Sequence, residues 1–147
     1  MQFPKNYSKA TVPPQNKVNL FFKGINIVEI DLRSQAIVLT FQYTILWYDN
    51  RIKIIDGVDF VPVSEEMKNF WIPNLIIQNQ IAAHSYSVVG DRILFGALKR
   101  KKGTQMMYSC LSKIEVACAM DYQFFPFDYQ NCSVLVKQNF IKEFKYI

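Results

Sequence analysis

The sequence predicts an all-β domain, either a sandwich or a barrel of short strands. Aromatic residues are abundant, with 12 Phe, 8 Tyr and 2 Trp among 147 residues, and such side chains suit a pleated surface. Large apolar residues recur at every second position along several stretches, as they do in half-buried strands. Turn residues separate these stretches at short intervals, which is typical of sandwiches and barrels.

The first half of the chain contains the clearest predicted strand, residues 36–47. Its odd positions, from Ile37 to Trp47, form the larger apolar face. Strand-like sequence also begins at Val18 and continues past a glycine to residue 28. After a turn at residues 49–50, residues 52–63 again look like a strand, and Ser64 caps a predicted helical turn over 64–67.

The second half repeats the pattern. Short strands are expected at residues 86–89 and 92–98, and a long one at 106–122, with its even positions in the core and its odd positions facing water. Cys132, Val134 and Val136 share a parity, which predicts a last strand.

A run of four cations, residues 99–102, ends at Gly103. Such a run could bind nucleic acid or anionic lipid. It lies between two apolar stretches, ends in glycine and lacks interleaved aromatics, so we expect a solvated hairpin tip and no nucleic-acid partner.

Composition sets broad limits. Half of the residues are apolar, a fifth are charged and the net charge is +5, so the chain is not a disordered tail. The length suits one domain, with a polar lead-in over 1–16 and the domain over 17–147. We see no apolar run long enough for a membrane helix and no signal-peptide pattern at the start, which taken alone suggests a soluble protein.

Three cysteines allow three single disulfides. Cys110 and Cys118 lie on one predicted strand, about 26 Å apart, which is beyond disulfide reach. Cys118 and Cys132 bracket a proline-containing turn, and a disulfide there would stabilise the fold by about 3 kcal/mol. A reduced pair in a cytosolic protein is the alternative that spacing leaves open. Sequons predict glycosylation at Asn6 and Asn131.

The segment from Cys118 to Cys132 carries a specific resemblance. Two cysteines enclose thirteen residues with the core Phe125-Pro126-Phe127-Asp128, and this resembles the signature loop of the Cys-loop receptors, the pentameric neurotransmitter-gated ion channels.

Other segments resemble that family in the same order. They are Trp47-Tyr48-Asp49-Asn50-Arg51-Ile52, Trp71-Ile72-Pro73-Asn74 and Asn79. Gly103 to Ser109 and Cys118-Ala-Met-Asp121 are similar to the anion-selective branch, whereas Phe-Pro-Phe-Asp is commoner in the cation-selective one. After Val136 the tail no longer follows the family.

The resemblance implies an immunoglobulin-like β-sandwich on the extracellular side of the cell membrane, cut short at its C-terminus. A small ligand would bind between neighbouring subunits of a homo- or hetero-pentamer. The loop would sit against a pore domain and relay the signal to the gate.

The resemblance also assigns roles to residues of the loop. Cys118 and Cys132 would form its disulfide, and Pro126 would follow a cis bond. Phe125 and Phe127 would meet the pore domain, unless both are plain core residues. The cationic partner that the family offers Asp128 lies beyond this chain, so this carboxylate is expected to be solvated or unsatisfied.

Five further residues are expected to be structural rather than ligand contacts: Trp47, Asp49, Arg51, Trp71 and Pro73.

The ligand-binding positions depart from the family. Gln42, Thr44 and Leu111 stand where relatives often have an aromatic residue or an arginine, and only Ser109 matches. Neither a cation for a carboxylate nor an aromatic cage for an amine is evident. The ligand is therefore unusual, or this subunit binds poorly and works beside others.

The remaining candidates suggest little chemistry. Cys110 is expected to be a buried free thiol that acts as a small apolar residue. His84, the single histidine, suggests no metal site, although a pH-sensing role is open. No catalytic triad or phosphate-binding glycine loop is present, so we expect no enzyme and no cofactor. The alternatives are a secreted pore-less binding protein, a non-functional truncated subunit and a cytosolic β-sandwich adaptor.

Overall fold

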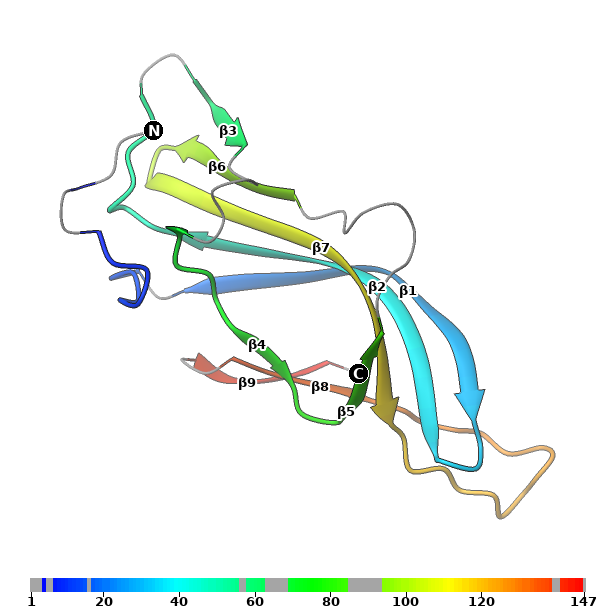
Figure 1. Ribbon diagram of the computed structural model, residues 1–147. Coiled ribbons are helices and arrows are strands. Elements are labelled where there is room, and N and C mark those ends of the chain that lie inside the picture. The colour runs from blue at the N-terminus through cyan, green and yellow to red at the C-terminus, as the bar shows by residue number, and fades with distance from the viewer. Residues whose placement is uncertain are drawn as a thin grey trace.

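The computed structural model describes residues 4, 7–15, 17–55, 58–62, 69–84, 94–138 and 141–146. These residues form a sandwich of two antiparallel β-sheets (Figure 1). The strands are β1 (Val18–Asp31), β2 (Ala36–Tyr48), β3 (Phe60–Pro62), β4 (Leu75–Ile77), β5 (Gln80–His84), β6 (Leu94–Arg100), β7 (Gly103–Ala117), β8 (Val134–Gln138) and β9 (Ile141–Tyr146). The predicted all-β sandwich is confirmed.

The larger sheet has the order β1-β2-β7-β6-β3, and β5 also pairs with β7. The smaller sheet has the order β4-β8-β9. Figure 1 shows β1, β2 and β7 running side by side as one long, bent sheet, with β4, β8 and β9 lying across from it. The segment between β7 and β8 therefore passes from one sheet to the other.

Some predicted strand boundaries are wrong. Strand β7 ends at Ala117 rather than at residue 122, because the chain turns away once the Cys118 amide donates to the carbonyl of Gln35. Among the described residues of the predicted strand 52–63, only residues 60–62 form a strand, since the Ile52 amide bonds back to the Asp49 carbonyl in a turn. The helical turn predicted at 64–67 and the strand predicted at 86–89 lie outside the described residues.

The basic run forms the tip of the β6–β7 hairpin, as predicted, with Arg100 paired to Gly103. Gly103 has a φ of +121°, and a Cβ atom there would collide with the side chain of Asn50. Both facts require glycine at this position. The hairpin tip is thereby packed directly against the turn that follows β2.

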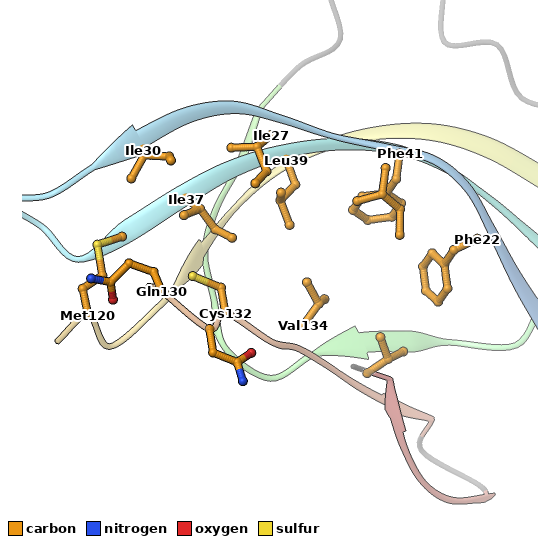
Figure 2. Close-up of a pocket in the computed structure, with 13 residues that line it drawn as sticks. Phe22, Ile27, Ile30, Ile37, Leu39, Phe41, Met120, Gln130, Cys132 and Val134 are labelled. Carbon is orange, nitrogen blue, oxygen red and sulfur yellow. The ribbon is translucent and has the colours of Figure 1, made fainter. Parts of the chain in front are cut away.

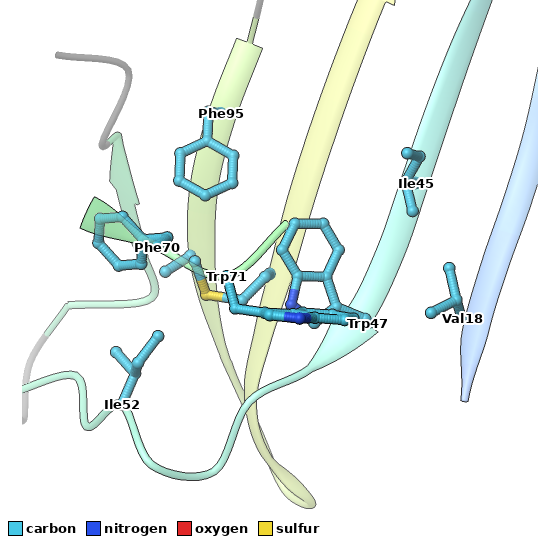
Figure 3. Close-up of a cluster of buried hydrophobic side chains, with 9 residues drawn as sticks. Val18, Ile45, Trp47, Ile52, Phe70, Trp71 and Phe95 are labelled. Carbon is cyan, nitrogen blue, oxygen red and sulfur yellow. The ribbon is translucent and has the colours of Figure 1, made fainter. Parts of the chain in front are cut away.

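Aromatic rings dominate the core near this hairpin (Figure 3). Trp47 stacks on Phe95 with 6.1 Å between ring centroids, and Trp71 meets Trp47 edge-on at 6.1 Å. Trp47, Trp71 and Pro73 are all buried, in keeping with structural roles. A second cluster, nearer the other end of β2 and β7, comprises Ile37, Leu39, Phe41, Ile114, Val116, Cys118 and Met120.

Arg51 connects the N-terminal segment to the sandwich. Its guanidinium forms two hydrogen bonds with the buried carboxylate of Asp49, at 2.8 and 2.7 Å, and two more with the carbonyls of Ser8 and Thr11. It also lies 4.6 Å from the ring centroid of Tyr7. Part of the predicted lead-in therefore packs on the sandwich, although its sequence is polar.

No helix among the described residues is long and apolar enough to cross a membrane.

Candidate functional site

The four ligand-binding candidates come together on one face of the larger sheet. Thr44 pairs with Ser109, and Gln42 pairs with Leu111, across the β2–β7 ladder. Paired residues of an antiparallel ladder project from the same side of the sheet. Since Phe41 and Ile45 point into the core, these four side chains lie on the opposite, outer face.

Ser109 is the centre of a hydrogen-bond network on this face. Its hydroxyl accepts from the Gln42 amide at 3.0 Å, lies 2.9 Å from the Thr44 hydroxyl and donates to the Tyr43 carbonyl at 3.3 Å. Its exposed fraction is only 6%. The expectation that position 109 faces water is thus wrong, because Gln42 and Thr44 cover it.

The chemistry of this network is neutral. Gln42 is exposed, Thr44 and Leu111 are half-buried, and together they present an amide, a hydroxyl and an apolar side chain. Such a surface can form hydrogen bonds with a ligand but supplies no charge from these residues. Among the described residues, no group of three or more His, Cys, Asp and Glu side chains could hold a metal ion.

The inner face behind the network is aromatic. Tyr43 and Tyr108 lie with ring centroids 5.9 Å apart, and burial, followed by the proximity of Tyr108 and Cys110, raises the pKa of Tyr43. Its phenol therefore stays protonated at neutral pH. Cys110 is free, as expected, but half-buried rather than fully buried, and its thiol donates to the Leu111 carbonyl at 3.4 Å.

A disulfide and one asparagine close the stem of the 118–132 loop. Cys118 and Cys132 are bonded, with 5.2 Å between their Cα atoms. Just outside this bond, the side-chain amide of Asn79 donates to the carbonyls of Ala117 and Ser133, at 3.0 and 2.7 Å. Its side-chain oxygen accepts from the Leu135 amide at 3.0 Å. Asn79 therefore joins the end of β7 to the start of β8.

The loop tip presents aromatic side chains to solvent. The Phe125–Pro126 bond is cis, as the resemblance implied. Phe125 is 65% exposed and Phe127 is 92% exposed, so the alternative that both are core residues is wrong. Phe124 and Tyr129 are also largely exposed. The tip is an apolar surface on the outside of the molecule.

Gln130 is a loop residue that the sequence reasoning missed. Its side chain exchanges two hydrogen bonds with the backbone of Asp121, at 3.0 and 2.7 Å, and also donates to the carboxylate of Asp128. Asp128 is therefore hydrogen-bonded within the loop rather than unsatisfied. No local sequence pattern around Gln130 indicates that its side chain forms hydrogen bonds across the loop.

A further hydrogen bond links the loop to the β1–β2 hairpin. The Tyr122 hydroxyl donates to the Leu32 carbonyl at 2.8 Å. In that hairpin the Asp31 carboxylate accepts from the amides of Arg33 and Ser34. The loop and the hairpin lie together at one end of the larger sheet, opposite the β6–β7 tip (Figure 1).

A cavity of about 440 Å³ lies between the sheets at this end (Figure 2). Its walls are mostly apolar side chains of β1, β2 and β8, including Ile27, Leu39 and Val134, with Gln130 and Cys132 from the loop. Asn131 is exposed beside it, so its sequon is accessible. Asn6, the other sequon residue, lies outside the described residues.

Comparison with known proteins decides the family. The family model for the neurotransmitter-gated ion-channel ligand-binding domain matches residues 2–142. The chain belongs to the neurotransmitter-gated ion-channel family. Members of this family are channels and not enzymes.

Curated channel subunits also resemble this ligand-binding domain. A glutamate-gated chloride channel subunit beta of Haemonchus contortus is 25% identical over 134 residues, which cover 88% of this chain. The acetylcholine receptor subunit alpha-type acr-5 of Caenorhabditis elegans is 26% identical over 151 residues, covering 89% of this chain. The two identities are similar, so they give little weight to the anion-selective branch. The chain spans 30% and 24% of the lengths of these relatives.

Proposed function

We propose that this chain is the extracellular ligand-binding part of a pentameric channel subunit, which passes a binding signal to a pore through the 118–132 loop. The observation that carries the proposal is the loop itself. Its stem is closed by a disulfide and by Asn79, while Phe125 and Phe127 at its tip project into solvent. An apolar tip on a fixed stem is suited to pressing against another domain.

A continuous strand connects the two parts of the proposed mechanism. Strand β7 carries Ser109 near its middle and ends at Ala117, next to the first cysteine of the loop. A ligand that contacts Gln42, Thr44 and Leu111 at a subunit interface would therefore act on the strand that leads to the loop. Ser109 is too covered to be a main contact, and its role in the proposal is to position Gln42 and Thr44.

The proposed ligand is small and is recognised here by hydrogen bonds rather than by a charge, because the outer-face network is neutral. A neighbouring subunit would supply any charged group that the ligand requires. The motifs from Gly103 to Ser109 and from Cys118 to Asp121 support a weak preference for anion-selective relatives.

Recordings from oocytes that express the full-length subunit test this function, with glutamate and acetylcholine as probes. We expect a current from the subunit alone or with a partner subunit. Phe127→Ala should reduce the maximal current by about tenfold, while the ligand affinity measured by displacement of a bound probe stays unchanged. Gln42→Ala should instead weaken binding by about fivefold, equivalent to one lost hydrogen bond. Tyr48→Phe, on the same face of β2, is the control.

Absence of current with both probes, alone and in co-expression, would count against a channel subunit. If the chain is instead secreted and binds a probe as a soluble oligomer, the pore-less alternative is correct. Replacement of chloride in the bath distinguishes the two kinds of selectivity. A shift of the reversal potential indicates an anion-selective channel, and no shift indicates a cation-selective one.

A further inference from the structure

A basic groove lies at the end of the larger sheet opposite the 118–132 loop. It has a volume of about 700 Å³ and is formed by the segment after β2 and the β6–β7 hairpin tip. The cations that line it are Lys53, Lys99, Arg100, Lys101 and Lys102. Within the part of the chain that the structure describes, no acidic side chain lines this groove.

The two walls of the groove are fixed to each other. The Thr104 hydroxyl donates to the Ile52 carbonyl at 2.6 Å, and the Asp49 amide donates to the Thr104 carbonyl at 3.0 Å. Gly103 leaves room for the Asn50 side chain between the walls. Because these contacts hold the hairpin tip beside the segment after β2, Lys53 from one wall faces the same space as the cations from the other.

Because five cations line one groove, a bound polyanion would meet several of them at once. Four of the five cations are lysines, whose ammonium groups act as point charges rather than as planar forks matched to one carboxylate. Two apolar side chains, the half-buried Ile54 and the exposed Ile55, line the same groove. This pattern suits a ligand with several tetrahedral anionic groups on rings that also have apolar faces.

We propose that this groove binds a sulfated polysaccharide. An acidic peptide fits less well as an added strand, because residues 96–98 of β6 are already paired on both edges, with β3 and with β7. Sulfate groups along a sugar chain can be bound by the ammonium groups alone, without a free strand edge.

The position of the groove also disfavours a lipid headgroup. The β6–β7 hairpin tip, which lines the groove, and the 118–132 loop lie at opposite ends of the larger sheet (Figure 1). If the loop faces the pore domain, as the proposed function requires, the groove points away from the membrane. Only this argument against a lipid headgroup rests on the proposed function.

Binding of a heparin octasaccharide to the 147-residue chain tests the proposal, with titration over a range of salt concentrations. We expect Lys101→Gln/Lys102→Gln to weaken binding by about tenfold at low salt and to reduce the slope of log K against log salt by about two. The matched control is Lys23→Gln/Arg33→Gln, which removes the same charge from exposed positions elsewhere. Thermal unfolding of both variants verifies that the fold is kept.

Equal loss of binding in the two double variants would overturn the proposal, since net charge alone would then explain it. Tighter binding to phosphatidylserine vesicles than to the octasaccharide would also overturn it, in favour of a membrane. Desulfated heparin should bind at least tenfold more weakly than heparin. The result is independent of channel activity, because oocyte currents can fail while the octasaccharide still binds.

Discussion

Arg51 shows how one side chain secures segments that are distant in sequence. It bonds to the Asp49 carboxylate, to two carbonyls of the N-terminal segment and to the face of Tyr7. The Tyr7 hydroxyl in turn donates to Asp49 at 3.2 Å and accepts from the Trp71 amide at 3.1 Å. Asp49 is 1% exposed, so these donors compensate for burying its charge.

We therefore expect Arg51→Lys to destabilise the chain by about 2 kcal/mol, although the charge is kept, because lysine cannot make the paired hydrogen bonds. Urea unfolding followed by Trp fluorescence measures this. Arg33→Lys, at an exposed position, should change stability by less than about 0.5 kcal/mol. Equal effects at the two positions would contradict the argument.

Asp31 provides a pH dependence with a defined sign. Hydrogen bonds from the side chain and backbone of Ser34, and then from the Arg33 amide, lower the pKa of Asp31 below its ordinary value of 3.8. The ionised carboxylate thus stabilises the β1–β2 hairpin above that pH, and this stabilisation is lost as the pH falls through the lowered pKa.

Asp31→Asn removes this titration. The stability difference between the natural chain and the variant should be constant above about pH 5 and should shrink toward pH 3. Unfolding midpoints between pH 3 and pH 6 measure it. A difference that does not change with pH would show that the carboxylate charge is unimportant.

Sequence reasoning succeeds for residues whose neighbours in the chain reveal their role. The motif around Trp47, Asp49 and Arg51 predicted structural roles, and the structure places these residues in the core and in an ion pair. It failed for Ser109, because burial there depends on Gln42 and Thr44, which are distant in sequence.

Strands with long, regular alternation were predicted well, and irregular segments were not. Strand β2 lies close to its predicted range, and β7 was predicted as a strand although it ends at Ala117 rather than at residue 122, since period-2 patterns over a dozen residues fit no other structure. The segment 52–63 was misread because Ile52 is buried in a turn, where an apolar side chain looks the same as in a strand.

A substitution at Asn79 tests whether this residue holds β7 and β8 together. Asn79→Asp removes both amide donors and places a carboxylate oxygen near two carbonyls, so we expect a loss of about 2 kcal/mol in unfolding free energy. Amide hydrogen exchange at Leu135 should accelerate as well. Gln78→Glu makes the same chemical change at the exposed neighbouring position, and a loss there as large as at Asn79 would refute the bridging role.

At the scale of the whole molecule, the two ends of the larger sheet differ in character. One end carries the exposed aromatic tip, and the other carries the basic groove. The signature loop was sufficient to predict the sandwich and the disulfide. The cavity between the sheets could not be predicted, because it depends on how far the two sheets stand apart rather than on any local pattern.

Strand β1 exposes three isoleucines along this cavity, Ile25, Ile27 and Ile30, at 61, 62 and 53%. A patch of this kind promotes association. We expect the isolated chain to self-associate in sedimentation velocity runs. Replacement of all three isoleucines by threonine should raise the protein concentration at which the chain associates by about tenfold. Threonine is chosen because it still favours strands.

The matched control replaces three exposed isoleucines that do not line the cavity, Ile55, Ile76 and Ile81. Their replacement by threonine should leave the sedimentation profile unchanged. A similar effect of both triple variants would indicate general stickiness rather than a patch.

The shared hydroxyl of Ser109 also has an evolutionary consequence. Since Gln42 and Thr44 both bond to it, a change at Ser109 removes a hydrogen-bond partner from both, whereas a change at Gln42 or at Thr44 leaves the other bond to Ser109 in place. In the orthologues of this chain, a replacement at position 109 should therefore be accompanied by replacements at positions 42 and 44. Lineages that exchange one alone should show altered ligand preference before they show loss of folding.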